Sequence, residues 1–241
     1  MEFTYEWYKL FISVAKNNYA IKQWDDPCEG IILRHDVDYD LQKACDFSLY
    51  EHELGVRSTY FILLTSDFYN IYSLNSQKYI QRILCAGHSI GLHFDETRYA
   101  DDTDKDFFCE KILWEAKRLS DITGVRIDKV SMHRPSKKML NWDIEIPGFV
   151  NTYSKYYFNN YKYFSDSRRN WRESVIEELK KRKYKNVQVL THPFWYMSTN
   201  KEKDIHDTIV DFVNSANHER YGYLNQNISD LSGIMTKDEI C

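Results

Sequence analysis

Residues 31–38 read IILRHDVD, an apolar run that ends in ionisable side chains. In a strand, side chains alternate between faces, so Asp36 and Asp38 would share one face and His35 would point to the other. Two carboxylates at the end of a buried strand are costly unless a metal ion or another cation binds them. They also suit a metal-assisted hydrolase, in which one carboxylate binds the ion and the other takes a proton from water. A strand that runs into an ordinary polar loop explains the segment equally well.

The segment 87–95 (GHSIGLHFD) contains His93, the strongest candidate for a metal ligand. Gly87 and Gly91 allow close backbone approach, and the segment is too short and too polar at its ends to be plain core. The alternative is a structural histidine bonded to a backbone carbonyl. We expect His88 to be structural, because it lies at the start of this predicted strand.

Two later segments, His133-Arg134-Pro135 and His192-Pro193, also follow apolar runs. Arg134 is predicted to pair with Asp36 and hold it ionised, although an exposed arginine beside a turn proline is the alternative. His133 either completes a metal site or faces away. His192 is well placed to protonate a leaving group. Trp195 is a candidate pocket wall, and core packing explains it at least as well.

The elements that must position these residues alternate regularly. The patterns predict helices over 5–19, 41–54, 76–85, 106–123, 173–182 and 203–216, and strands over 31–38, 56–64, 88–94, 129–133 and 187–190. Such alternation predicts an α/β fold with a parallel sheet or barrel, in one domain spanning 1–241. Sites in these folds form at the carboxyl ends of strands, and the candidates on four separate strands fall there. The irregular, aromatic-rich stretch 141–172 is expected to carry loops over the site.

Composition narrows the class of protein. The 241 residues are 43% hydrophobic, which is enough for a sizeable core, and the net charge of −4 argues against binding nucleic acid by charge. We predict no membrane span, because no segment has about 18 consecutive apolar residues. No signal peptide is visible and the five cysteines are scattered, so a cytoplasmic location is expected. The oligomeric state is not predicted.

Taken together, these segments resemble the polysaccharide deacetylases of the NodB-homology type (carbohydrate esterase family 4-like). The resemblance covers about residues 29–196 and rests on the order of four motifs. These motifs are RHDVD (34–38), GHSIGLH (87–93), HRP (133–135) and LTHP (190–193). It implies a single-domain distorted (β/α)7-type barrel. It also implies one divalent metal ion, commonly zinc, that serves to hydrolyse N-acyl or O-acyl groups of sugars.

The resemblance assigns roles residue by residue. Asp36 matches the catalytic base, Arg134 the arginine that orients this base, and His192 the general acid. His93 matches the first histidine of the metal-binding motif. The stretch YFSDS (163–167) with Trp171 is similar to a feature of a divergent subgroup. The residues expected to bind substrate are Asp95, Asp166, Trp171 and Trp195.

Two departures from the family pattern affect the metal site. Val37 separates the usual adjacent aspartate pair, so Asp38 becomes the metal carboxylate. Thr97 occupies the position of the second metal histidine, four residues after His93. Catalytic zinc sites normally have three protein ligands. We therefore predict His133 as the third ligand, with Asp95 or His192 as alternatives.

Together with the roles that the resemblance implies, these residues predict a metal-dependent hydrolase, with zinc as the expected ion, that removes an acetyl or formyl group from an amino sugar. The expected substrate is a small amino sugar or sugar conjugate, such as a cytoplasmic precursor in surface-polysaccharide biosynthesis. Two other hypotheses stay open. One is a metal-independent hydrolase of cyclic amides or ureides on the same barrel, which Thr97 favours. The other is a catalytically inactive relative that binds sugars.

Overall fold

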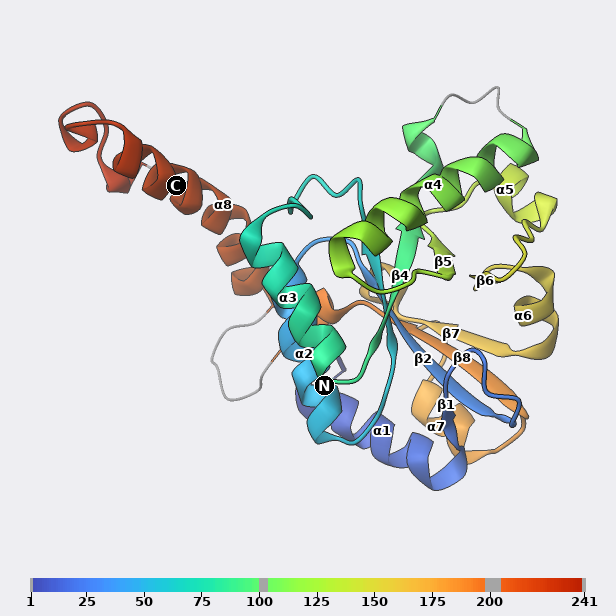
Figure 1. Cartoon of the computed structure of the whole chain (residues 1–241). Coiled ribbons are helices and arrows are strands. Elements are labelled where there is room, and N and C mark those ends of the chain that lie inside the picture. Colours follow the sequence, from blue (N-terminus) through green and yellow to red (C-terminus); the bar gives the residue numbers. More distant parts are fainter. Residues whose placement is uncertain (1, 100–103, 198–204, 240–241) are drawn as a thin grey trace. The chain divides into compact units, whose positions relative to one another are not determined.

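The computed structural model describes residues 2–99, 104–197 and 205–239. Short parallel strands alternate with helices along most of this chain (Figure 1). The strands are β1 (Ile21–Lys22), β2 (Gly30–Val37), β3 (Thr59–Leu63), β4 (Ser89–Phe94), β5 (Lys129–Met132), β6 (Val150–Asn151), β7 (Lys162–Ser165) and β8 (Asn186–Thr191). The α-helices are α1 (Tyr5–Asn18), α2 (Leu41–Glu53), α3 (Leu74–Cys85), α4 (Lys105–Thr123), α5 (Lys137–Trp142), α6 (Lys155–Asn160), α7 (Val175–Lys180) and α8 (Ile205–Asn227).

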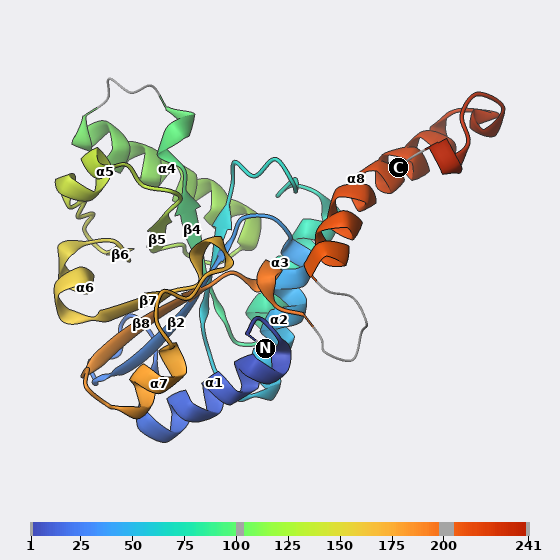
Figure 2. The same ribbon diagram turned by 180° about the vertical axis from the view of Figure 1, so that it is seen from behind.

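The strands form one curled parallel sheet in the order β6-β5-β4-β3-β2-β8-β7, with β1 beside β2. The two ends of this order, β6 and β7, are joined along the chain by α6 (Figures 1 and 2). All eight residues of the central strand β2 are buried, as expected for a parallel strand covered on both faces. This architecture confirms the predicted fold class, a distorted (β/α)7-type barrel.

The strand order explains why distant residues meet. In a parallel sheet all carboxyl ends lie at one edge, and here β2 has β3 and β8 as its neighbours, with β4 and β5 next in line. In the register of the sheet, His35 on β2 is opposite Thr191 on β8, and Leu63 on β3 is opposite His93 on β4. The ends of β2, β4, β5 and β8 therefore converge on one region.

Local signals set the helix boundaries. Asp40, Ser73 and Asp104 each accept a hydrogen bond from a backbone N–H of the first turn of α2, α3 and α4. Gly124 ends α4 in the left-handed conformation with φ of 74°, so the helix stops at residue 123, where the sequence predicted its end. Helices α2, α3 and α4 pack against one another in succession (Figure 1). The loops before these helices leave the same sheet edge that carries the candidate residues.

The stretch 141–172, predicted to be irregular, is more ordered than expected. It contains the end of α5 and the short elements β6, α6 and β7, and β7 pairs with β8 along Lys162–Ser165. Four residues are too few to display a clear period of two, so the pattern did not reveal this strand. Helix α8 continues to Asn227, well beyond the predicted end at 216, and its predicted first residues, 203 and 204, lie outside the described residues.

The described chain falls into two compact units. The larger comprises residues 2–3 and 7–196 and holds the sheet, and the smaller combines residues 4–6 with Met197 and the described residues 205–239, including α8. Within the smaller unit, Thr4 pairs with Met197 in an isolated parallel bridge. A single domain over 1–241 stays a prediction. None of the helices in the described ranges has the length and apolar character that a bilayer span requires.

Candidate active site

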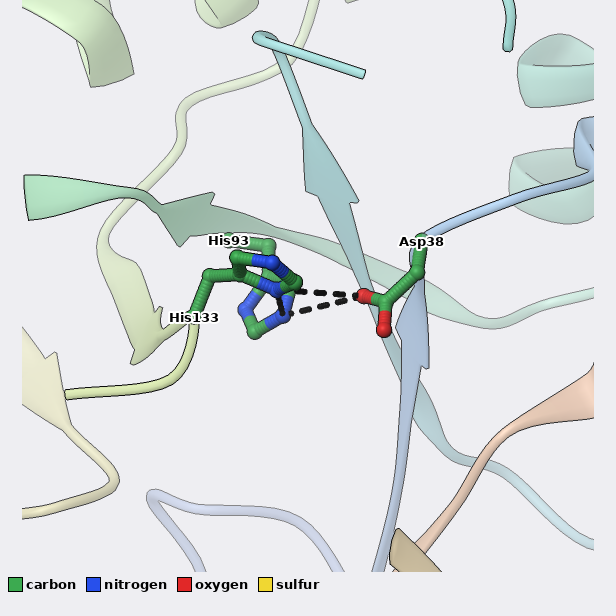
Figure 3. A group of neighbouring side chains, drawn as sticks. All are labelled: Asp38, His93 and His133. Carbon is green, nitrogen blue, oxygen red and sulfur yellow. Dashed lines mark hydrogen bonds and ion pairs between the residues drawn. The ribbon is translucent and has the colours of Figure 1, made fainter. Parts of the chain in front are cut away.

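Asp38, His93 and His133 bring three potential metal-ligand atoms together (Figure 3). His93 Nε2 lies 3.1 Å from Asp38 Oδ1, His133 Nδ1 lies 3.5 Å from the same oxygen, and the two ring nitrogens are 3.1 Å apart. A tetrahedral zinc ion with bonds of about 2.0–2.1 Å requires donor atoms about 3.3 Å apart. The three separations match this triangle, so these residues fit a divalent ion.

The positions of the three residues follow from the strand ends. His93 is on β4, Asp38 follows the last residue of β2, and His133 follows the last residue of β5. The His133 backbone N–H donates to the Phe94 carbonyl at 2.7 Å, which continues the β4–β5 pairing by one residue. The backbone of Asp38 is fixed by Ser66, whose hydroxyl donates to the Asp38 carbonyl oxygen at 2.9 Å.

The electrostatics of this cluster favour an ionised Asp38. Burial by itself would raise the pKa of this carboxyl, but hydrogen bonds from His133 and His93 hold the pKa far below its usual value. Burial lowers the pKa of His93, and the carboxylates of Asp36 and Asp38 outweigh this and raise it. Among the described residues, buried Asp38 Oδ1 accepts no hydrogen bond from a hydroxyl or a backbone N–H, and its polar neighbours are the ring nitrogens of His93 and His133. A cation at the centre of the triangle would neutralise that oxygen.

Asp36, the predicted base, lies beside this cluster and pairs with Arg34. Arg34 Nη2 donates to Asp36 Oδ2 at 2.9 Å, and the Ser131 hydroxyl lies 3.3 Å from both carboxylate oxygens. Asp36 Oδ2 is 3.7 Å from His93 Nε2. Burial would raise the pKa of Asp36, but Arg34 and His93 keep it below its usual value. Asp36 is thus a carboxylate next to the metal-ligand triangle.

The predicted pairing of Arg134 with Asp36 is wrong, and Arg34 takes this place. Arg134 turns away just after β5 in the left-handed conformation, with φ of 46°, and its side chain is exposed. Arg34 precedes Asp36 by two residues on the same face of β2 and is 0% exposed. The alternation that grouped Asp36 with Asp38 could have identified Arg34 as well.

Arg34 is fixed by aromatic rings and hydroxyls. Its guanidinium carbon lies 5.5 Å from the Phe61 ring centroid and 5.0 Å from that of Tyr153, and its Nη atoms donate to Thr152 and Ser131. Gly91 makes room for the Phe61 ring, because a Cβ at position 91 would come within 2.4 Å of it. A fixed guanidinium gives Asp36 a fixed orientation.

His192 is oriented by Asp166 on the other side of the cluster. His192 Nδ1 lies 2.6 Å from Asp166 Oδ1, and the His192 backbone N–H donates to Asp166 Oδ2 at 3.0 Å. Its Nε2 faces the metal-ligand triangle, 3.9 Å from Asp38 Oδ2. Burial lowers the pKa of His192, and the opposing attraction of Asp166 is stronger and raises it to about 9. His192 is therefore poised to carry a proton on Nε2.

Three of the predicted substrate-binding residues have other surroundings. Asp166 is 0% exposed and bonded to His192, so it positions His192 and is not on the surface of a pocket. Trp171 is buried, with its ring centroid 5.6 Å from that of Trp7, so it packs in the core. Asp95 caps a short 3-10 helix and accepts hydrogen bonds from the backbone and hydroxyl of Thr97. Neither it nor the exposed Thr97 belongs to the metal-ligand triangle.

Trp195, the fourth predicted substrate-binding residue, is beside the site. Its ring centroid is 6.3 Å from that of His192 and 5.6 Å from that of Tyr39, and the Tyr39 ring is 5.5 Å from Phe68. These rings come from the segments that follow β8, β2 and β3. Phe68 is 57% exposed, so an aromatic surface lies on the His192 side of the cluster.

No family model and no curated protein matches this chain. Solved structures similar to it include the family 4 carbohydrate esterase domain of a multidomain xylanase from the hindgut metagenome of Trinervitermes trinervoides (13% identity, 78% of this chain and 84% of that chain, TM-score 0.45). A family 4 carbohydrate esterase from Streptomyces lividans, in complex with acetate, has 12% identity over 76% of this chain and 84% of that chain, with a TM-score of 0.45. A family 4 pseudoenzyme from Bacillus anthracis has 13% identity, a TM-score of 0.44, and coverage of 78% of this chain and 62% of its own. All three belong to the family that the sequence resembles.

Proposed function

We propose that this protein is a metal-dependent hydrolase that removes a small N-acyl group from an amino sugar. The observation that carries the proposal is the triangle of Asp38, His93 and His133, with ionised Asp36 on one side and His192 on the other. Two imidazoles and one carboxylate are a ligand set typical of catalytic zinc. We therefore propose Zn²⁺ as the resident ion.

The residues around the triangle can divide the proton transfers of amide hydrolysis. A divalent ion bound there supplies Lewis-acid chemistry, polarising the acyl carbonyl and lowering the pKa of water. Asp36, oriented by Arg34, accepts the proton of the attacking water. His192 Nε2 donates a proton to the departing amine, while Asp166 holds its Nδ1. The pKa of Asp36 is lowered and that of His192 is raised, so at neutral pH the base is ionised and the acid is protonated, as the two roles require.

The surroundings of His192 support a sugar as the leaving group. The general acid must contact the amine, so the part of the substrate that carries the amine lies on the His192 side. The rings of Trp195, Tyr39 and Phe68 are on this side and offer apolar surface beside polar groups. A pyranose ring, with its apolar faces and polar rim, suits such a surface. A small sugar conjugate in the cytoplasm stays a prediction from the sequence.

Metal analysis combined with a turnover assay tests the proposal against its two rivals. The purified protein is assayed for zinc by elemental analysis, and for acetate release from N-acetylglucosamine oligomers, before and after chelation. We expect about one equivalent of zinc and a loss of turnover on chelation that zinc restores. Turnover that survives complete removal of metal would establish the metal-independent hydrolase. Oligomer binding without any acyl release, with zinc present, would establish the inactive sugar-binding relative.

A further inference from the structure

A second cluster of ionisable residues lies on the opposite face of β2. Both carboxylate oxygens of Glu51, which is 0% exposed, accept hydrogen bonds: Oε1 from the Tyr8 hydroxyl at 2.5 Å, and Oε2 from the Ser58 hydroxyl at 2.5 Å and the Tyr60 hydroxyl at 2.9 Å. His35 Nε2 lies 3.1 Å from Glu51 Oε1. The Glu51 cluster, meaning these five residues, takes no part in the proposed chemistry.

One contact links the Glu51 cluster to the candidate active site. His35 Nδ1 lies 2.6 Å from the Thr191 hydroxyl, and both residues are 1% exposed. Thr191 is the last residue of β8 and directly precedes His192. The two ring nitrogens of His35 therefore face different partners, with Nε2 directed at Glu51 and Nδ1 at the Thr191 hydroxyl.

We infer that His35 and Thr191 are positioning residues that keep His192 in place for proton donation. Asp166 anchors His192 from the β7 side, and the contact of Thr191 with His35 anchors the preceding residue from the β2 side. With both anchors, Nε2 stays directed at the metal-ligand triangle. With only one, the end of β8 can shift relative to β2, and small displacements of a catalytic group have large effects on rate. This inference rests on the proposed function.

The atoms of His35 allow a matched pair of variants. In histidine, Nδ1 is bonded to Cγ, and in asparagine the amide oxygen and nitrogen are bonded to Cγ as well. The Nε2 atom of histidine is one bond further from Cγ, and the amide atoms of glutamine are at the same distance along the side chain. His35→Asn therefore keeps a polar atom facing Thr191 and loses the Glu51 contact, and His35→Gln does the reverse. Both variants remove the ring from the same buried place, so their losses of stability should be similar. Thr191→Val removes the hydroxyl, Thr191→Ser retains it, and Ser58→Ala removes a Glu51 hydrogen bond that does not involve β8.

The readout is the ratio of amide to activated-ester hydrolysis. N-acetylglucosamine oligomers have a poor leaving group that needs the general acid, whereas 4-nitrophenyl acetate has one that leaves unprotonated. For His35→Gln and Thr191→Val we expect kcat on the amide to fall about tenfold, with KM unchanged and the ester rate within about twofold of wild type. His35→Asn, Thr191→Ser and Ser58→Ala should keep the amide-to-ester ratio.

A second readout needs no substrate. The ¹⁵N imidazole signals of His192, assigned with His192→Gln, should move in His35→Gln and Thr191→Val and stay in place in His35→Asn and Thr191→Ser. Equal shifts in both His35 variants, or no shift in any variant, would overturn the inference, whether or not the amide is a substrate. Failure of the wild type to release acetate, with the NMR pattern as expected, would count against the proposed function and leave the positioning intact.

Discussion

Two carboxylate–histidine clusters lie on opposite faces of β2, and they differ in how their carboxylates are satisfied. In the Glu51 cluster both oxygens accept hydrogen bonds from hydroxyl groups. At the metal-ligand triangle, Asp38 Oδ1 faces two imidazole nitrogens and accepts no hydroxyl or backbone N–H hydrogen bond among the described residues. Similar residue types thus form a hydroxyl-bonded carboxylate in one place and a set of converging metal-ligand atoms in the other.

The difference shows what makes an ionisable cluster a site. Buried carboxylates need compensation, and the protein supplies it for Glu51 through Tyr8, Ser58 and Tyr60. For Asp38 the compensation comes from the imidazoles of His93 and His133, which are themselves metal-ligand groups, so an ion can take the place of these contacts. The groups that face the carboxylate, which are hydroxyls for Glu51 and imidazole nitrogens for Asp38, distinguish the structural cluster from the candidate metal centre.

The sharpest test of this contrast compares Asp38→Ala with Glu51→Gln. We expect Asp38→Ala to lose the bound ion and to lower turnover at least about 10³-fold, because the ion's Lewis-acid contribution is worth several kcal/mol. Glu51→Gln should retain about one equivalent of zinc per chain. Elemental analysis and acetate release are the measurements, with Thr97→Ala as a control that keeps both. A metal content that depends on Glu51 and not on Asp38 would reverse the assignment of the two clusters.

His133→Ala isolates the third predicted ligand. With only Asp38 and His93 left, the affinity for zinc should fall at least about 100-fold, since two protein ligands bind zinc weakly. Competition with a chromophoric chelator measures the affinity. Unchanged affinity would remove His133 from the ligand set.

Asp36→Asn separates the base from the metal ligands. We expect zinc to remain and turnover to fall by about 10²–10⁴-fold, the usual contribution of a general base. The measurement is kcat on the amide substrate together with metal content of the same preparation. Loss of zinc in this variant would make Asp36 a ligand instead of a base.

The two arginines provide a matched comparison of stability. Arg34→Met leaves Asp36 buried without its cation and should lower the free energy of unfolding by about 3–5 kcal/mol. Arg134→Met changes an exposed side chain and should alter it by less than about 0.5 kcal/mol. Urea unfolding measures both, and equal effects would contradict the observed placement of the arginines.

The smallest effect concerns the acid stability that the Glu51 cluster provides. Burial would raise the pKa of Glu51, but His35, His88 and Ser58 lower it from 4.5 to about 2. A depressed carboxyl pKa stabilises the fold above the unfolded-state value, and this stability is lost as the pH falls from about 4.5 to about 2. The group contributes on the order of 3 kcal/mol. Urea unfolding between pH 7 and 3 should show a shallower decline in the free energy of unfolding for Glu51→Gln than for the wild type. Parallel curves for the two proteins would show that Glu51 is not the source of this acid-dependent loss of stability.

Much of the fold was predictable because its signals are local. Apolar patterns predicted most helices and strands, and the strand β7 was missed because four residues carry too little pattern. Within the site, alternation along β2 correctly separated His35 from Asp36 and Asp38. The same alternation puts Arg34 on the face of Asp36, but the sequence prediction paired Asp36 with Arg134, and the structure has Arg34 beside Asp36.

The sequence by itself determined which residues stand at strand ends and which share a face, because a period of two is a property of adjacent residues. Only the tertiary structure decided which of these residues meet. Whether His133, Asp95 or His192 stands nearest to Asp38 and His93 depends on sheet order and on register between strands. Ser131 and Asp36, for example, are 95 positions apart in the chain and lie 3.3 Å apart in the fold. No local pattern encodes that distance, since it results from packing the whole sheet.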